Sequence, residues 1–128
     1  MILTIEKKDK NHTIITSNPL DMGVLFDFLE EYGLVMALQK SIEEDIKNKA
    51  YSDFTFNSTG IKVKGDNFII YDLFSGEDDE DYYPEEHGFE VPQQALWKLL
   101  EEYDKAVDTS WKKMEISFDG KEFELKVE

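Results

Sequence analysis

The residues best suited to chemistry lie in one acidic stretch, residues 75–92, which reads SGEDDEDYYPEEHGFEVP. It holds eight carboxylates and no lysine. Clustered carboxylates bind hard cations such as Ca²⁺, and a pair of them can carry out acid–base hydrolysis. A carboxylate-rich surface also steers and binds cationic proteins. The stretch therefore has three candidate roles: metal binding, catalysis and protein recognition.

The spacing argues against the first two roles. A helix–loop–helix calcium site has glycine at its sixth loop position and a closing glutamate at its twelfth, and this stretch has neither. Paired carboxylates such as Asp78 and Glu80 would need burial to tune their pKa values for catalysis, whereas this segment has the composition of a solvated one. The only histidines, His12 and His87, would have to converge to act together. We therefore predict no metal site, no cofactor and no enzymatic activity.

Protein recognition fits the stretch better. Tyrosine is favoured at the centre of protein interfaces, where its ring is buried and its hydroxyl still forms hydrogen bonds. Two adjacent tyrosines stand here among carboxylates, although their rings could instead pack back onto the domain. The predicted partner-binding residues are Glu77, Asp78, Asp79, Glu80, Asp81, Tyr82, Tyr83, Glu85 and Glu86. The alternative binding surfaces are the acidic helix faces that carry Glu43, Glu44, Glu101 and Glu102.

The composition narrows the choice of partner. The chain has 128 residues, a net charge of −15 and no arginine. Residues 1–64 carry ten acids and eight lysines, and residues 65–128 carry nineteen acids and six lysines. Nucleic-acid recognition relies on positive charge and arginine side chains, so we expect neither nucleic acid nor a membrane surface as a partner, and a basic protein instead. The absence of cysteine and of a secretory signal in MILTIEKKDK fits a cytoplasmic protein.

Two periodicities divide the chain into strands and helices. Alternating or β-branched residues predict strands at residues 2–6, 13–16, 52–58, 60–65, 67–74, 89–91, 114–118 and 123–127. Helical spacing predicts a helix from Asn18, as its cap, to Gly33, a second over residues 34–50 and a third from Pro92 onward. Gly33 either separates the first two helices or bends a single one. The exposed face of the first helix carries three acids, Asp27, Glu30 and Glu31.

These elements predict a single domain, residues 1–128, with an acidic connector at residues 75–91. The expected fold class is α+β, with a mainly antiparallel sheet of about six or seven strands and two or three helices packed on one face. One core should contain residues from the strands and from two of the helices. Its expected members are Leu25, Phe28, Phe68, Ile70, Leu96, Leu100, Ile116, Phe118, Phe123 and Leu125.

Three features follow one another over residues 60–103: the apolar strands in GIKVKGDNFIIYDLF, the acidic connector and the helix in EVPQQALWKLLEEY. In this order they resemble bacterial immunity proteins of polymorphic and contact-dependent growth inhibition toxin systems. The resemblance implies a cytoplasmic, non-catalytic antitoxin that binds one cognate toxin domain, often a nuclease, and blocks its active site. It carries over no catalytic residue.

The charge agrees with that reading, because nuclease sites are cationic in order to hold phosphate, and an acidic surface can occupy them. We therefore predict an immunity protein that neutralises a basic, nuclease-type toxin domain. The alternatives are a structural or adaptor domain with an acidic solubilising loop and a carboxylate-based metal-binding protein.

Overall fold

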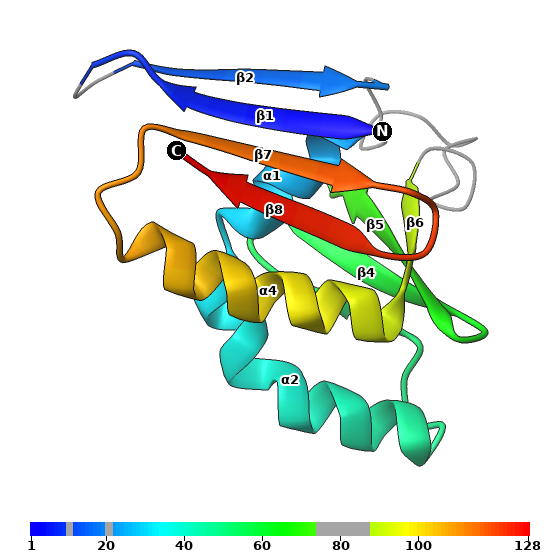
Figure 1. Ribbon diagram of the computed structural model, residues 1–128. Helices are drawn as coiled ribbons and strands as arrows, with labels where there is room; N and C mark the ends of the chain where they lie inside the picture. The colour runs from blue at the N-terminus through cyan, green and yellow to red at the C-terminus, as the bar shows by residue number, and fades with distance from the viewer. Residues whose placement is uncertain (10–11, 20–21, 74–87) are drawn as a thin grey trace.

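The computed structural model describes residues 1–9, 12–19, 22–73 and 88–128. Within them, eight strands form two antiparallel sheets of four strands each, joined by three helices (Figure 1). The first sheet has the order β2-β1-β7-β8, and the second has the order β3-β4-β5-β6. The strands of the first sheet are β1 (Ile2–Lys7), β2 (Thr13–Asn18), β7 (Lys113–Phe118) and β8 (Phe123–Val127). Those of the second are β3 (Asp53–Thr55), β4 (Thr59–Lys64), β5 (Asn67–Asp72) and β6 (Phe89–Pro92).

The α+β class and the antiparallel pairing are confirmed, but the prediction of one sheet of about six or seven strands covered on one face is wrong. The first sheet joins the two ends of the chain, because β1 pairs with β7 as well as with β2. The second sheet is built from the middle of the chain alone. Alternation within a strand predicts hairpins but carries no information on which hairpins pair, so residues 2–7 and 113–118 could not be joined from the sequence.

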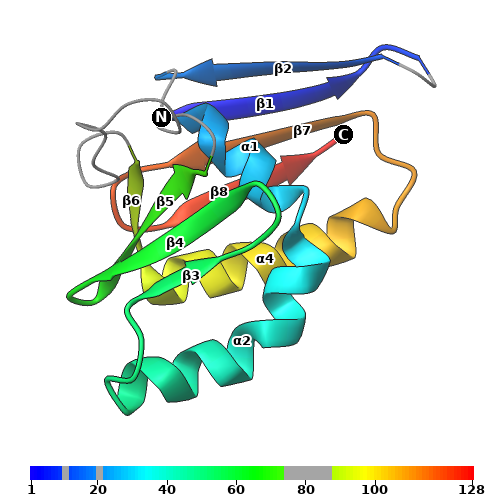
Figure 2. The same cartoon turned by 180° about the vertical axis from the view of Figure 1, so that it is seen from behind.

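Helix α1 (Gly23–Leu29) lies between the two sheets, as both views show (Figures 1 and 2). It contacts β2 of the first sheet and β4 and β5 of the second. Its predicted start at Asn18 and Pro19 is wrong, because β2 runs through Asn18 and Met22 occupies the cap position. Asn18 is the last residue of β2, where it pairs with Ile2. It therefore belongs to a strand and lies several residues before the start of α1.

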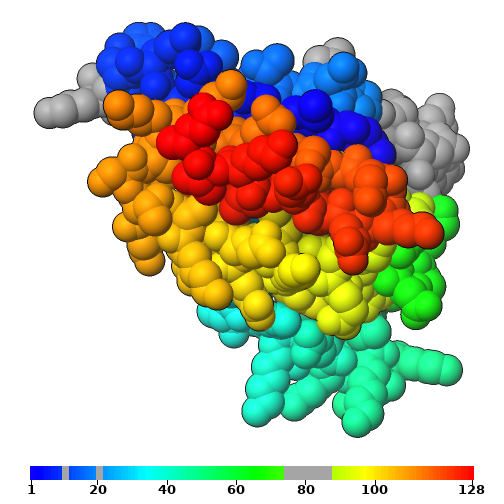
Figure 3. Space-filling view, in the orientation of Figure 1, coloured from blue at the N-terminus to red at the C-terminus, as the bar shows by residue number. Residues whose placement is uncertain are grey.

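Helix α2 (Tyr32–Lys47) follows α1 directly, and the break falls at Glu30 and Glu31 rather than at Gly33. Gly33 lies in the first turn of α2, so it neither ends the first helix nor bends a longer one. Helix α2 extends away from the body of the protein (Figure 3). Val35 and Ile42 of this helix are buried, while Leu38 is exposed.

Helix α4 (Gln93–Val107) begins one residue after Pro92, which ends β6 and serves as the helix cap. It contacts β8, β6 and α2, so its neighbours lie on more than one side. This explains why Trp97 and Leu99 are buried along with the predicted stripe through Leu96 and Leu100. The ring of Trp97 meets Phe68 of β5 edge to face, with centroids 5.6 Å apart.

The predicted single core is confirmed. Of its ten members, eight are buried in one apolar cluster, and Phe123 and Leu125 are partly buried against it. The two sheets meet where Phe89 of β6 contacts Phe118 of β7, with ring centroids 5.5 Å apart. None of the described helices is long and apolar enough to cross a membrane.

The burial of α4 makes Leu100 a sensitive test of this packing. Because the Leu100 side chain is 1% exposed, Leu100→Ala should lower the free energy of unfolding by about 2–5 kcal/mol. The exposed neighbour Glu101 provides the matched control, since Glu101→Ala should change it by less than about 0.5 kcal/mol. Chemical denaturation of both variants measures the difference, and equal losses would show that α4 is misplaced.

Candidate functional site

The predicted partner-binding residues lie outside the described part of the chain. This holds for all of them: Glu77, Asp78, Asp79, Glu80, Asp81, Tyr82, Tyr83, Glu85 and Glu86. The described residues on either side of this segment are Leu73 and Gly88. Leu73 directly follows β5, which ends at Asp72, and Gly88 directly precedes β6. The two strands pair with each other, since Phe89 of β6 lies opposite Ile70 of β5. Leu73 and Gly88 therefore lie at the same end of the second sheet.

A cluster of carboxylates lies at that end, which we call the carboxylate cluster: Asp27, Glu30, Glu31 and Asp72. Asp27 lies in the last turn of α1, Glu30 and Glu31 connect α1 to α2, and Asp72 ends β5 beneath α1. The acids of α1 were predicted to be exposed, and Asp27 and Glu30 are. Their meeting with Asp72 was not predicted, because it depends on how α1 packs on β5.

Two acids of this cluster, Asp27 and Glu30, have raised pKa values. Partial desolvation raises the pKa of Asp27 above its usual value, and the charges of Asp72 and Glu31 raise it further. Desolvation also raises the pKa of Glu30, with added repulsion from Asp27 and Glu31. In the described chain, the charged groups that shift these two pKa values are thus all carboxylates. A cation close to Asp27 and Glu30 would offset this repulsion and lower their pKa values again.

The helix end adds to this negative charge. The carbonyl groups at the C-terminus of a helix carry partial negative charge, so acidic side chains are unfavourable there and basic ones favourable. The last turn of α1 contains no basic residue. Charges of one sign gathered at such an end do not stabilise α1, which is consistent with a role outside the fold.

Glu31 has a different function from its neighbours. Its carboxylate accepts hydrogen bonds from the backbone N–H of Asn57, at 2.9 Å, and from that of Ser58, at 2.7 Å. It also accepts a short hydrogen bond from the Ser58 hydroxyl. These bonds fix the junction of α1 and α2 to the turn between β3 and β4. Glu31 therefore positions the cluster, while Asp27 and Glu30 present their charge to solvent.

A second polar group near the cluster was also not predicted. Thr59 is fully buried, and its hydroxyl has no hydrogen-bond partner within the described residues. It pairs with Asp72 across β4 and β5, so the two side chains share a face of the sheet. A buried hydroxyl without a partner costs stability.

The other residues singled out from the sequence do not converge on the cluster. His12 is exposed, with its Nδ1 atom 3.3 Å from a carboxylate oxygen of Asp9, and His87 lies in the segment that the structure does not describe. Two pairs of acids form the alternative helix faces. Glu43 and Glu44 are on α2, and Glu101 and Glu102 are on α4.

The two tryptophans pack within the fold or at its edge. Trp97 is 4% exposed within the core. Trp111 is partly buried at the edge of the core, where the Lys7 ammonium lies 3.9 Å from its ring centroid. Trp97 is therefore closed off from solvent, whereas Trp111 packs beneath Lys7 and lines a shallow hollow at the surface.

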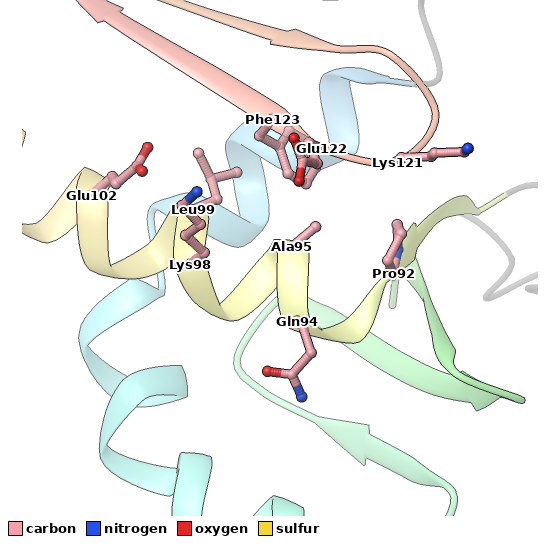
Figure 4. Close-up of a pocket in the computed structure, with 9 residues that line it drawn as sticks. All are labelled: Pro92, Gln94, Ala95, Lys98, Leu99, Glu102, Lys121, Glu122 and Phe123. Carbon is pink, nitrogen blue, oxygen red and sulfur yellow. The ribbon is translucent and has the colours of Figure 1, made fainter.

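A cleft of about 220 Å³ lies between α4 and the turn from β7 to β8 (Figure 4). Its lining carries two lysines, Lys98 and Lys121, and two glutamates, Glu102 and Glu122. Pockets for small ligands usually exceed about 300 Å³ and hold a few convergent polar groups. The balanced charges of this smaller cleft select neither an anion nor a cation, so the carboxylate cluster is the better candidate.

No protein-family model, curated protein or solved structure matches this chain. Among the described residues, no group of three or more histidine, aspartate or glutamate side chains is arranged to hold a metal ion. The resemblance to immunity proteins thus stays a prediction. The carboxylate cluster is the feature of the described residues from which a function can be proposed.

The raised pKa of Asp27 gives a prediction for stability against pH. An acid whose pKa is higher in the folded state destabilises the fold progressively as the pH rises from its unfolded value, 3.8, through its folded value. Asp27→Asn should therefore raise the melting temperature at pH 7, and the gain should disappear near pH 3. Thermal unfolding across this range measures the effect.

Glu31→Gln is the matched control, because it removes the same charge from the same cluster. It should lower the melting temperature at pH 7, since it weakens the hydrogen bonds to Asn57 and Ser58. If both substitutions shift the melting temperature in the same direction, Glu31 is not the positioning residue and Asp27 the exposed charge that we infer.

Proposed function

We propose that this protein is an immunity protein, which binds a cognate, basic bacterial toxin domain of the nuclease type and blocks its active site. The observation that carries the proposal is the carboxylate cluster, where Asp27, Glu30 and Asp72 lie together and two of them have raised pKa values. The chain continues from Asp72 into the acidic connector after only two further residues, so cluster and connector are contiguous in sequence.

The chemistry of a nuclease site makes it a suitable target. Such a site binds phosphate through lysine, arginine or metal cations, and its positive field extends into solvent. Carboxylates held by a folded scaffold can take the place of the phosphates. The approach of a cation to Asp27 and Glu30 also relieves repulsion that already exists in the free protein.

The net charge of −15 supports fast association as well as affinity. Complementary charges raise the rate of encounter, and salt reduces the effect. The expected signature is an association rate that falls steeply with ionic strength. A hydrophobic interface without charge steering would lack this dependence.

The first test is to find a neighbouring gene whose product this chain neutralises, and to measure binding kinetics with that product at low and high salt. The paired substitution Asp27→Asn with Glu30→Gln should slow association and flatten its salt dependence, and change dissociation less. The matched control is Glu115→Gln with Glu124→Gln, which removes the same charge from the outer face of the first sheet. If both pairs of substitutions slow association equally, the net charge of the chain alone attracts the partner, and the carboxylate cluster is not part of the interface. If no neighbouring gene encodes a protein whose toxicity this chain relieves, the proposed function is wrong.

The acidic connector provides a second test with the same partner. Neutralising Asp78, Asp79, Glu80 and Asp81 should slow association, because these charges would steer the encounter. Tyr82→Ala or Tyr83→Ala should instead speed dissociation, and at least one should cost about 2 kcal/mol of binding free energy or more. Wild-type kinetics in all three variants would show that the connector is a solvated linker. The cluster and the helix faces carrying Glu43, Glu44, Glu101 and Glu102 would then be the remaining surfaces.

A third test separates this proposal from the metal-binding alternative. Addition of Ca²⁺ to the purified protein should leave its melting temperature unchanged, since a ligand stabilises a fold only in proportion to its binding. A rise of several degrees, reversed by a chelator, would favour a carboxylate-based metal site instead.

A further inference from the structure

The first half of α2 presents an uncharged surface to solvent. Residues 32–39 contain no charged side chain, whereas 34% of the residues of the whole chain are charged. Leu34 and Leu38 are 41% and 39% exposed, and Gly33 and Ala37 are exposed beside them. Residues three or four positions apart are neighbours on the surface of a helix. These four residues therefore form one continuous patch, which we call the α2 patch.

The stability of the fold does not account for the α2 patch. Helix α2 packs mainly on α4 and extends away from the body of the protein (Figure 3), and the residues that it buries are Val35 and Ile42. Helix propensity does not require exposed leucine either, because lysine, glutamate and glutamine favour a helix about as well. The second half of α2 uses lysine and glutamate at its exposed positions. The two exposed leucines are thus available to a partner.

The α2 patch has a fixed position relative to the carboxylate cluster. Glu31, at the junction of α1 and α2, accepts hydrogen bonds from the turn between β3 and β4. The ring of Tyr32 meets that of Tyr103 on α4 edge to face, with centroids 5.4 Å apart, and Val35 has no exposed surface. These anchors all fall at or near the first turn of α2. A surface that is already ordered loses little conformational entropy when a partner binds to it.

Acidic residues border the α2 patch at both ends. Residues 30–45 carry five acids and a single lysine, Lys40. Glu30 precedes the patch and belongs to the carboxylate cluster, and Glu44 and Asp45 follow it along α2. An apolar centre inside a polar rim is the usual arrangement of a specific protein interface. An acidic rim favours a partner whose apolar side chains are surrounded by lysine or arginine.

We propose that the α2 patch is the apolar centre of the surface that binds the basic toxin domain, with the carboxylate cluster at its rim. This inference rests on the proposed function and adds to it a second kind of contact. The carboxylates attract the partner during encounter, whereas Leu34 and Leu38 hold it afterwards, because buried apolar contacts at the centre of an interface slow dissociation. The matching surface of the toxin should be apolar with a basic border.

Charge argues against the other occupants of an exposed apolar helix face. A second copy of this chain, with its net charge of −15, would bring its own acids against those that border the patch. An anionic membrane surface would be repelled in the same way. A basic protein is the partner that gains from both the apolar centre and the acidic rim.

The experiment measures binding kinetics with the gene product that this chain neutralises. Leu34→Ala with Leu38→Ala should speed dissociation by about tenfold or more and change association little. Both variants should fold, because the side chains are exposed and alanine favours a helix. The matched control is Ile2→Ala with Ile14→Ala, which removes two aliphatic side chains of similar exposure, 43% and 46%, from the first sheet. It should leave both rates unchanged.

Ala37→Glu separates apolar contact from charge. If acidic charge alone held a basic partner, one more carboxylate on this surface would tighten the complex. If the α2 patch is buried against apolar side chains, the added carboxylate loses its hydration and dissociation becomes faster, which is the expected result. The matched control is Ser41→Glu, which adds the same charge one turn further along α2, beyond the patch. It should not speed dissociation.

Wild-type dissociation in both the leucine pair and Ala37→Glu, with the toxin still neutralised, would overturn this inference and leave the proposed function standing. Self-association of the purified chain that the leucine pair abolishes would also overturn it, because a second copy would then occupy the patch. If no gene product is neutralised by this chain, the proposed function and this inference are both wrong.

Discussion

The burial of α1 between the two sheets is the constraint on which the rest of the structure depends. Leu25, Phe28 and Leu29 have no exposed surface, and each fully buried side chain of this size stabilises the fold by about 1.5–3 kcal/mol. A helix enclosed in this way can hold charged groups only at its open side and its end, where Asp27 and Glu30 lie. Exposed charge interactions are worth about 0–1 kcal/mol each, so the apolar packing outweighs the repulsion within the cluster. The scaffold can therefore hold like charges together at this end of α1.

Local features of this fold could be predicted from the sequence, and its long-range assembly could not. The period-two pattern around Ile116 and Phe123 and the helical stripe through Leu96 and Leu100 depend on neighbours in the chain, and both were confirmed. The pairing of Ile5 with Met114 depends on residues more than a hundred positions apart. The strands show the same alternation of residues whether they form one large sheet or two smaller ones. The division into two sheets therefore cannot be recognised from any single stretch of the sequence.

The candidate site shows the same limit at single residues. Asp27, Glu30 and Glu31 occupy one stretch of sequence, and nothing in their spacing separates a positioning residue from an exposed charge. The difference arises because the turn at Asn57 and Ser58 reaches Glu31 and not Glu30. Asp72 could have been noticed as the last residue of a buried strand before the acidic connector, yet its partner on α1 is set by packing alone. The acidic composition could be predicted, whereas the grouping of particular acids required the fold.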